Sequence, residues 1–293
     1  SVYDLDLERA VEKINKEDLK LVGIQIPEGL KIHVFKILDY LEENTSAEYI
    51  ISGDPCYGAC DLVDDKLKNL GCKLLIHIGH TRIPALNKTK IPVLFINAVA
   101  DLEINGVIEK AIPSLSGKKI GITTTAQHVN VIDDVKKILK ENEFEPVVSA
   151  GDKRIDFPGQ ILGCNFSSAT KVKDKVDMFL YVGSGNFHPL GMMISTGKDV
   201  IVCDPYTNKV TYKEISDFKD MVLRQRYGAI TRSKNSKNFG IIISFKKGQN
   251  RFDLAKKLKK LVEKKSKNAY FISVDYLYPA NLESFRDIDC FVS

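Results

Sequence analysis

The sequence lacks any apolar run long enough to span a membrane, and it has no secretory signal at its start. The segment from Ser1 to Lys13 is charged and amphipathic instead. The chain also lacks an initial Met, which indicates a processed or shortened N-terminus. We therefore expect a cytoplasmic protein without membrane contact. In that compartment its six cysteines should be reduced, so a disulfide framework is not expected.

A strong charge of one sign is also missing, because the net charge is only +5 over 293 residues. Lysines concentrate between Lys256 and Lys267. This pattern is typical of the solvated face of an amphipathic helix, and a docking surface for an acidic macromolecule is the alternative. We expect no direct binding of nucleic acid.

One βαβ pattern occurs three times along the chain, with opening strands at 19–26, 118–123 and 238–243. Further strands are predicted at 47–52, 73–78, 92–97, 145–150, 178–182, 200–203 and 270–273, and helices at 31–43, 129–141 and 251–264. Short apolar strands that alternate with helices predict parallel sheets with helices on their faces. We predict an α/β protein of three Rossmann-like domains, 1–113, 114–232 and 233–293, around a central site. The third copy is incomplete, and we expect the natural protein to continue past Ser293.

Two cysteines occupy equivalent places in the first two copies. Cys60 and Cys164 each follow the second strand of a copy, on loops at the carboxyl ends where open α/β sheets bind ligands. Thiolates that meet in this way typically bind a metal or an iron–sulfur cluster. We expect Cys72, Cys203 and Cys290 to be packed residues. A packed residue is also the default for Cys56, and the alternative is that Cys56 and Cys60, four apart, ligate one metal, although no matching second pair lies nearby.

The spacing of a recognised zinc motif is also absent, so the residues alone leave three interpretations open. The first is a cluster-dependent enzyme built on Cys60 and Cys164. The second is a zinc hydrolase that adds one loop histidine, and the third is a non-catalytic scaffold with structural cysteines. The loop histidines are His80, His128 and His188.

Five segments together resemble a known family along the whole chain. They are residues 25–29 (QIPEG), 54–61 (DPCYGACD), 160–165 (QILGCN), 181–191 (YVGSGNFHPLG) and 226–230 (RYGAI). These motifs are similar to signatures of the diphthamide synthase family, and within it to the archaeal enzymes of the first diphthamide step.

The resemblance implies three similar α/β domains, each of which supplies one cysteine to a central [4Fe-4S] cluster. Cys60 and Cys164 would be the first two ligands. The family's third ligand stands in a Cys-Pro-Arg motif, which this sequence lacks. We therefore expect the third ligand beyond Ser293, with Cys290 as the fallback.

The resemblance also implies the chemistry. Three thiolates leave one iron open for S-adenosylmethionine, and a reduced cluster gives one electron to the sulfonium. The expected product is a 3-amino-3-carboxypropyl radical that adds to a histidine of translation elongation factor 2. An electron donor and a homodimer are implied as well. The compact CxxxCxxC loop of conventional radical enzymes is absent.

Three loops that follow strands, 25–29, 127–128 and 183–188, are expected to hold S-adenosylmethionine between the domains, beside the open iron. Gly183-Ser184-Gly185 resembles a nucleotide-binding turn but lacks the spacing of the full dinucleotide fingerprint. We expect Gly185→Val to weaken cofactor binding by crowding its loop. The predicted cofactor-binding residues are Gln25, Pro27, Glu28, Gly29, Gln127, His128, Gly183, Ser184, Gly185 and His188.

Overall fold

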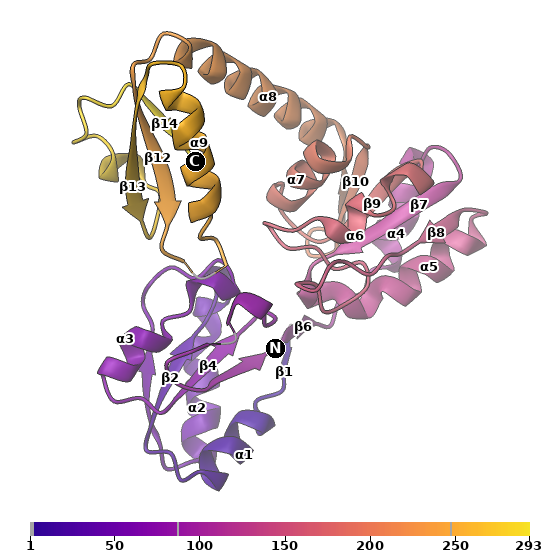
Figure 1. The fold of residues 1–293 in the computed structure, drawn as a ribbon. Helices are drawn as coiled ribbons and strands as arrows, with labels where there is room; N and C mark the ends of the chain where they lie inside the picture. The colour runs from indigo at the N-terminus through magenta and orange to yellow at the C-terminus, as the bar shows by residue number, and fades with distance from the viewer. Residues whose placement is uncertain (1–2, 87, 247) are drawn as a thin grey trace. The chain divides into compact units, whose positions relative to one another are not determined.

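The computed structural model describes residues 3–86, 88–246 and 248–293 (Figure 1). The chain divides into two compact units, one up to Lys219 and one from Asp220 onward. Among the helices of these ranges, none is both long and apolar enough to cross a membrane.

The first unit begins with a four-stranded parallel sheet in the order β3-β2-β4-β5. Its strands are β2 (Leu21–Gln25), β3 (Glu48–Ile51), β4 (Leu74–Ile78) and β5 (Val93–Ile96). Its helices are α1 (Glu8–Lys16), α2 (Val34–Asn44) and α3 (Asp64–Asn69). A separate antiparallel pair joins β1 (Tyr3–Leu5) to β6 (Ala98–Ala100).

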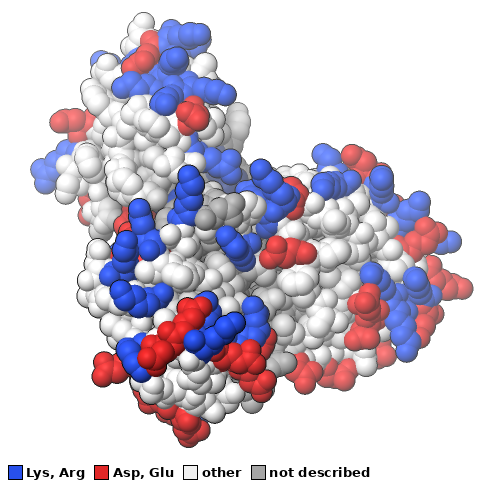
Figure 2. All heavy atoms as spheres, turned by 60° about the horizontal axis from the view of Figure 1, so that its bottom comes forward, with Lys and Arg blue, Asp and Glu red and all other residues white. Residues whose placement is uncertain are grey.

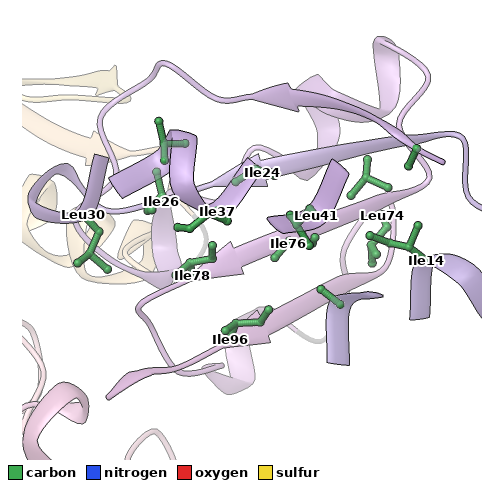
Figure 3. Packing of buried hydrophobic residues seen from close by; sticks show 14 of the residues in the cluster. Ile14, Ile24, Ile26, Leu30, Ile37, Leu41, Leu74, Ile76, Ile78 and Ile96 are labelled. Atoms are coloured by element: carbon green, nitrogen blue, oxygen red, sulfur yellow. The ribbon is translucent and has the colours of Figure 1, made fainter. Parts of the chain in front are cut away.

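Helices cover both faces of this sheet, which explains why its central strand β4 is buried at all five positions and apolar at every one except His77. On one face, Ile14 of α1 and Leu41 of α2 share a buried cluster with Leu74 and Ile76 of β4 (Figure 3). On the other face, Leu67 of α3 belongs to a second, smaller core cluster. This packing holds the strands so that their carboxyl ends share one edge.

The first unit also contains a five-stranded sheet in the order β8-β7-β9-β10-β11, in which only β11 is antiparallel. Its strands are β7 (Lys119–Thr124), β8 (Glu145–Val147), β9 (Met178–Val182), β10 (Val200–Asp204) and β11 (Lys209–Thr211). The helices are α4 (Asn105–Ala111), α5 (Ile132–Glu141), α6 (Ser167–Thr170) and α7 (Phe187–Thr196). The long helix α8 (Lys213–Ser233) follows and continues into the second unit.

The second unit contains a three-stranded parallel sheet in the order β13-β12-β14. Its strands are β12 (Asn238–Ser244), β13 (Asn268–Val274) and β14 (Cys290–Val292), and α9 (Phe252–Glu263) packs on one face. The core of this sheet is small, with Phe239, Ile241, Ala255 and Ala269 at its centre.

The predicted α/β class with mostly parallel sheets is confirmed, and the three sheets share the strand order second, first, third. The helices predicted to begin at 31 and 129 start later, because Glu28–His33 and Ala126–Val131 form 3-10 turns. Helix α8 and strand β11 were not predicted. The division into three domains stays a prediction.

Candidate functional site

Cys60 lies in a 3-10 turn, Ala59–Asp61, that follows β3. The Oδ2 atom of Asp61 accepts hydrogen bonds from the backbone N–H of Tyr57 (2.7 Å) and of Gly58 (3.0 Å). These bonds close the turn around the cysteine. The Cys60 side chain is partly buried, so it stands at the boundary between the protein core and solvent.

Cys164 stands at the tip of a tight turn between Leu162 and Asn165. The backbones of these two residues exchange hydrogen bonds of 2.9 and 3.0 Å. The amide of Asn165 donates to Asp152 Oδ1 over 2.8 Å, which anchors the turn. Cys164 itself is exposed.

An apolar cluster brings the two cysteine-bearing loops together. Cys60 and Leu162 both pack against this cluster, whose buried members are Ala59, Ile83 and Leu86. Leu162 is two residues before Cys164. The two loops come from different sheets, and both contact this apolar cluster. This shared packing supports the prediction that the two loops lie close together.

Polar contacts join the same two sheets at their carboxyl edges. Gln160 Nε2 donates to Thr81 Oγ1 over 3.2 Å, and both residues are buried. Gln127 Nε2 donates to the Gly79 carbonyl over 3.0 Å. A Cβ added at Gly79 would lie 2.8 Å from Pro27 Cγ, so Gly79 also lies against the loop that follows β2. The loops that follow β2 and β7, which are two of the three predicted cofactor loops, thus both lie against Gly79.

The third predicted cofactor loop starts next to this junction. Thr124, at the end of β7, donates through Oγ1 to the carbonyl of Val182 over 2.7 Å, directly before Gly183. Gly185 has a φ of +77°, which favours glycine, and an added Cβ would meet nothing within 4 Å. A Cβ at this position would therefore strain the backbone without meeting a neighbour, and the expected loss of cofactor binding in Gly185→Val stays a prediction.

Gln25 is fully buried, and protein groups occupy both ends of its amide. Its Nε2 donates to the carbonyl of Asp61 over 2.6 Å, and its Oε1 lies 3.0 Å from His77 Nδ1. This geometry supports a role in positioning the Cys60 turn. Contact between the Gln25 amide and a ligand is less favoured.

Glu28 and Gly29 are exposed at the start of the 3-10 turn Glu28–His33. Glu28 forms an ion pair with Lys31 at 2.5 Å, and this hydrogen bond lowers the pKa of the carboxyl group. The same carboxylate accepts a hydrogen bond from the backbone N–H of Cys56 over 3.3 Å. Glu28 thus connects this turn to the loop that carries the cysteines.

His128 and His188 are neutral at physiological pH. The Nε2 atom of His128 lies 2.9 Å from the Tyr206 hydroxyl, and its Nδ1 lies 3.2 Å from Thr125 Oγ1. Burial lowers the pKa of His128 to about 4, against an opposing effect of the Asp204 charge. His188 stacks on Tyr181 with ring centroids 6.2 Å apart, and burial lowers its pKa to about 4 as well.

The other four cysteines differ in their surroundings. Cys72 and Cys203 are buried within apolar clusters, as predicted. Cys290 lies in β14 and packs on the small core of its sheet, which favours a structural role. Cys56 is buried too, but it lies beside imidazoles: its sulfur, His77 and His80 offer ligand atoms within 4.8 Å of one another.

Sequence reasoning missed the residues that hold the loops. Asp61, Gly79 and Thr81 were assigned no role, although each fixes a loop of the candidate site. Asp61 and Gln160 stand inside the 54–61 and 160–165 motifs. A polar residue next to a loop cysteine is a usable signal, because such a residue often orients the loop.

The first part of the lysine-rich segment lies on α9, where Lys256, Lys257 and Lys260 are exposed as predicted for a solvated helix face. The remaining lysines follow the end of the helix: Lys264, Lys265 and Lys267. Lys256 pairs with Asp253 at 3.4 Å and Lys259 with Glu263 at 3.7 Å. Positive and negative side chains are interspersed on the face of the molecule that Figure 2 shows.

The family model described as "Putative diphthamide synthesis protein" matches residues 26–293. The chain belongs to the diphthamide synthesis family. The 2-(3-amino-3-carboxypropyl)histidine synthase of Pyrococcus horikoshii is 35% identical over 288 residues, which are 97% of this chain and 81% of that protein. The protein of the same name from Methanocaldococcus jannaschii is 32% identical over 314 residues, covering 100% of this chain and 82% of the relative.

A solved structure of this family has the same fold. The crystal structure of Dph2 from Pyrococcus horikoshii with a 4Fe-4S cluster superimposes with a TM-score of 0.89 at 34% sequence identity. The match covers 99% of this chain and 84% of the other. The family resemblance read from the sequence motifs is therefore confirmed.

Proposed function

We propose that this chain transfers a 3-amino-3-carboxypropyl group from S-adenosylmethionine to a histidine of translation elongation factor 2, the first step of diphthamide biosynthesis. One observation carries the proposal: nearly the whole chain matches, in sequence and fold, a Dph2 structure with a 4Fe-4S cluster. Relatives that bear the name 2-(3-amino-3-carboxypropyl)histidine synthase cover the chain to the same extent.

The Cys60 and Cys164 loops fit such a cluster. Iron–sulfur clusters are held by thiolates, and their potential depends on hydrogen bonds and solvent exposure. Here the two thiols come from separate loops that share an apolar cluster, one thiol partly buried and one exposed. Cys60 and Cys164 would hold the cluster, and a third thiolate would come from outside these loops.

The chemistry belongs to the bound group and the positioning to this chain. When bound, the cluster supplies one electron to the sulfonium, so that the bond to the methionine γ-carbon breaks into a 3-amino-3-carboxypropyl radical and methylthioadenosine. Asp61 and Gln25 hold the Cys60 turn in place. The apolar cluster of Ala59, Ile83 and Leu86 covers one side of Cys60.

S-Adenosylmethionine would lie along the carboxyl edges where the three cofactor loops approach one another. The backbone N–H of Gly183 donates to the carbonyl of Cys203 over 3.0 Å, so the donors to the carboxylate of S-adenosylmethionine would come from the exposed Ser184 and Gly185. Helix α7, which starts at Phe187, adds a favourable dipole for negative charge. The neutral imidazoles of His128 and His188 avoid repulsion of the positive sulfonium.

The proposal also includes the division into domains and the partners of the protein. The strand order shared by the three sheets supports domains at 1–113, 114–232 and 233–293 around a central site. Elongation factor 2 would be the protein substrate, and a homodimer and a separate electron donor complete the proposal.

The test is anaerobic reconstitution of the full-length protein with iron and sulfide. Cys60→Ala and Cys164→Ala should lose most bound iron, the visible absorption of the cluster and the cleavage of S-adenosylmethionine. Cys72→Ala, which removes a buried thiol from an apolar cluster, is the matched control and should keep all three. Unchanged iron and cleavage in both loop variants would overturn the proposal. A wild-type protein that hydrolyses substrate with zinc and no iron would favour the zinc hydrolase.

A further inference from the structure

Three side chains outside the proposed cluster gather at the carboxyl edge of the first sheet. Cys56 comes from the loop after β3, His77 from β4, and His80 from the loop that follows β4. One thiol sulfur and two imidazole nitrogens lie within 4.8 Å of one another. Cys56 and His77 are buried, and His80 is partly buried. Thiol and imidazole are ligands that transition metals select.

Hydrogen bonds already orient the two imidazoles. Because Gln25 Nε2 donates to the carbonyl of Asp61, its Oε1 is the acceptor for His77 Nδ1–H at 3.0 Å. The lone pair of His77 Nε2 therefore points at His80 Nδ1, 3.0 Å away. An imidazole that donates from one nitrogen to a fixed acceptor and presents the other is typical of metal-binding histidines.

We propose that Cys56, His77 and His80 form a mononuclear Zn²⁺ site, distinct from the pair Cys60 and Cys164. Zinc bonds of about 2.1 Å to nitrogen and 2.3 Å to sulfur place tetrahedral ligand atoms roughly 3.4–3.6 Å apart. A spacing of at most 4.8 Å thus requires side-chain shifts of about 1 Å. A thiolate with two imidazoles suits zinc better than Mg²⁺ or Ca²⁺, which prefer oxygen.

Charge and protons also balance at this site. Zn²⁺ bound to one thiolate and two neutral imidazoles carries a single positive charge. The negative charge of Asp61 acts on both Cys56 and His80 and would compensate it. Both imidazoles stay neutral: the proton that His80 Nδ1 donates to His77 Nε2 without metal moves to His80 Nε2 when Nδ1 binds zinc, so the only proton that leaves the protein is that of the Cys56 thiol. The fourth position is filled by water, as in open zinc sites.

A metal here would tie the loop after β3 to β4. That loop carries Cys60 four residues after Cys56, so zinc would limit the motion of the turn Ala59–Asp61. The inference does not depend on the proposed transferase activity, because none of its three ligands is a ligand of the proposed cluster.

The test uses the full-length protein, reduced and freed of metal by a chelator, with Zn²⁺ alone as the probe. Equilibrium dialysis with elemental analysis measures zinc per chain, and calorimetry in two buffers of different ionisation enthalpy counts released protons. We expect about one zinc and about one proton per chain. Co²⁺ in place of zinc should show the visible bands of a tetrahedral thiolate complex.

Variants decide which side chains bind the zinc. Cys56→Ser and His80→Gln should each weaken zinc binding at least about tenfold, with an unchanged circular dichroism spectrum. Using both variants keeps the test valid if one of them fails to fold. Cys72→Ser is the matched control, and Cys60→Ser and Cys164→Ser should also keep the zinc. Zinc that persists in folded Cys56→Ser and His80→Gln, or that is lost with Cys60 and Cys164, would overturn the site.

Discussion

His128 should make the first unit sensitive to acid. Its side chain is 5% exposed and bonded to Tyr206 and Thr125, and burial lowers its pKa to about 4. An unfolded chain would take up a proton at this residue near pH 6.5, where the folded chain does not. The unfolded state therefore binds more protons between these two values, and stability falls as the pH falls through 6.5 towards 4.

The size of the effect follows from the two pKa values. With about 6.5 in the unfolded state and about 4 in the folded state, His128 alone should lower the free energy of unfolding by about 2 kcal/mol between pH 7 and pH 5. His77, His80 and His188 also have lowered pKa values, so the free energy of unfolding of the whole protein should fall by more than this amount. The contribution of His128 is isolated only by comparing variants.

Urea unfolding at pH 7 and pH 5 measures this contribution. His128→Gln keeps a neutral side chain at both pH values. The drop in its free energy of unfolding from pH 7 to pH 5 should therefore be about 2 kcal/mol smaller than that of the wild type. Tyr206→Phe is the control, because it removes one partner of the imidazole but keeps the titrating group. Its pH dependence should stay close to that of the wild type. Equal losses in the wild type and His128→Gln would show that His128 does not titrate as its burial requires.

Three further changes have defined outcomes. Leu41→Ala empties a fully buried position and should lower the free energy of unfolding by about 3 kcal/mol in denaturant titration, and a change below about 1 kcal/mol would contradict the packing. Gly121→Ala places a Cβ 2.4 Å from an aromatic ring of β9 and should destabilise by about 1–3 kcal/mol in thermal unfolding; an unchanged melting temperature would refute this close approach. Gly185→Ala should destabilise the protein by about 1 kcal/mol, because the φ of Gly185 is +77°. Gly29→Ala should be neutral, although an added Cβ meets nothing within 4 Å at either position. Equal effects of the two variants would exclude backbone strain as the cause.

The sequence determined the main parallel strands and the class of fold, but not the short strands β1, β6 and β11. Short, mostly apolar runs such as 74–78 and 178–182 are typical of strands buried on both faces, and β4 and β9 are buried at every position. The repeated pattern also predicted the equivalent loops of Cys60 and Cys164, because the carboxyl ends of parallel strands share an edge. Family motifs identified the chemistry, since they combine residue types that packing alone does not require.

Only the tertiary structure decided which residues of those loops meet. The contacts of Gln127 with Gly79 and of Gln160 with Thr81 join residues 48 and 79 positions apart, which no local pattern encodes. The same holds for Cys56, which the sequence presented as a packed residue and the fold places beside His77 and His80. Periodicity reports which face of an element is buried, whereas the partner of a buried polar group depends on how separate elements pack.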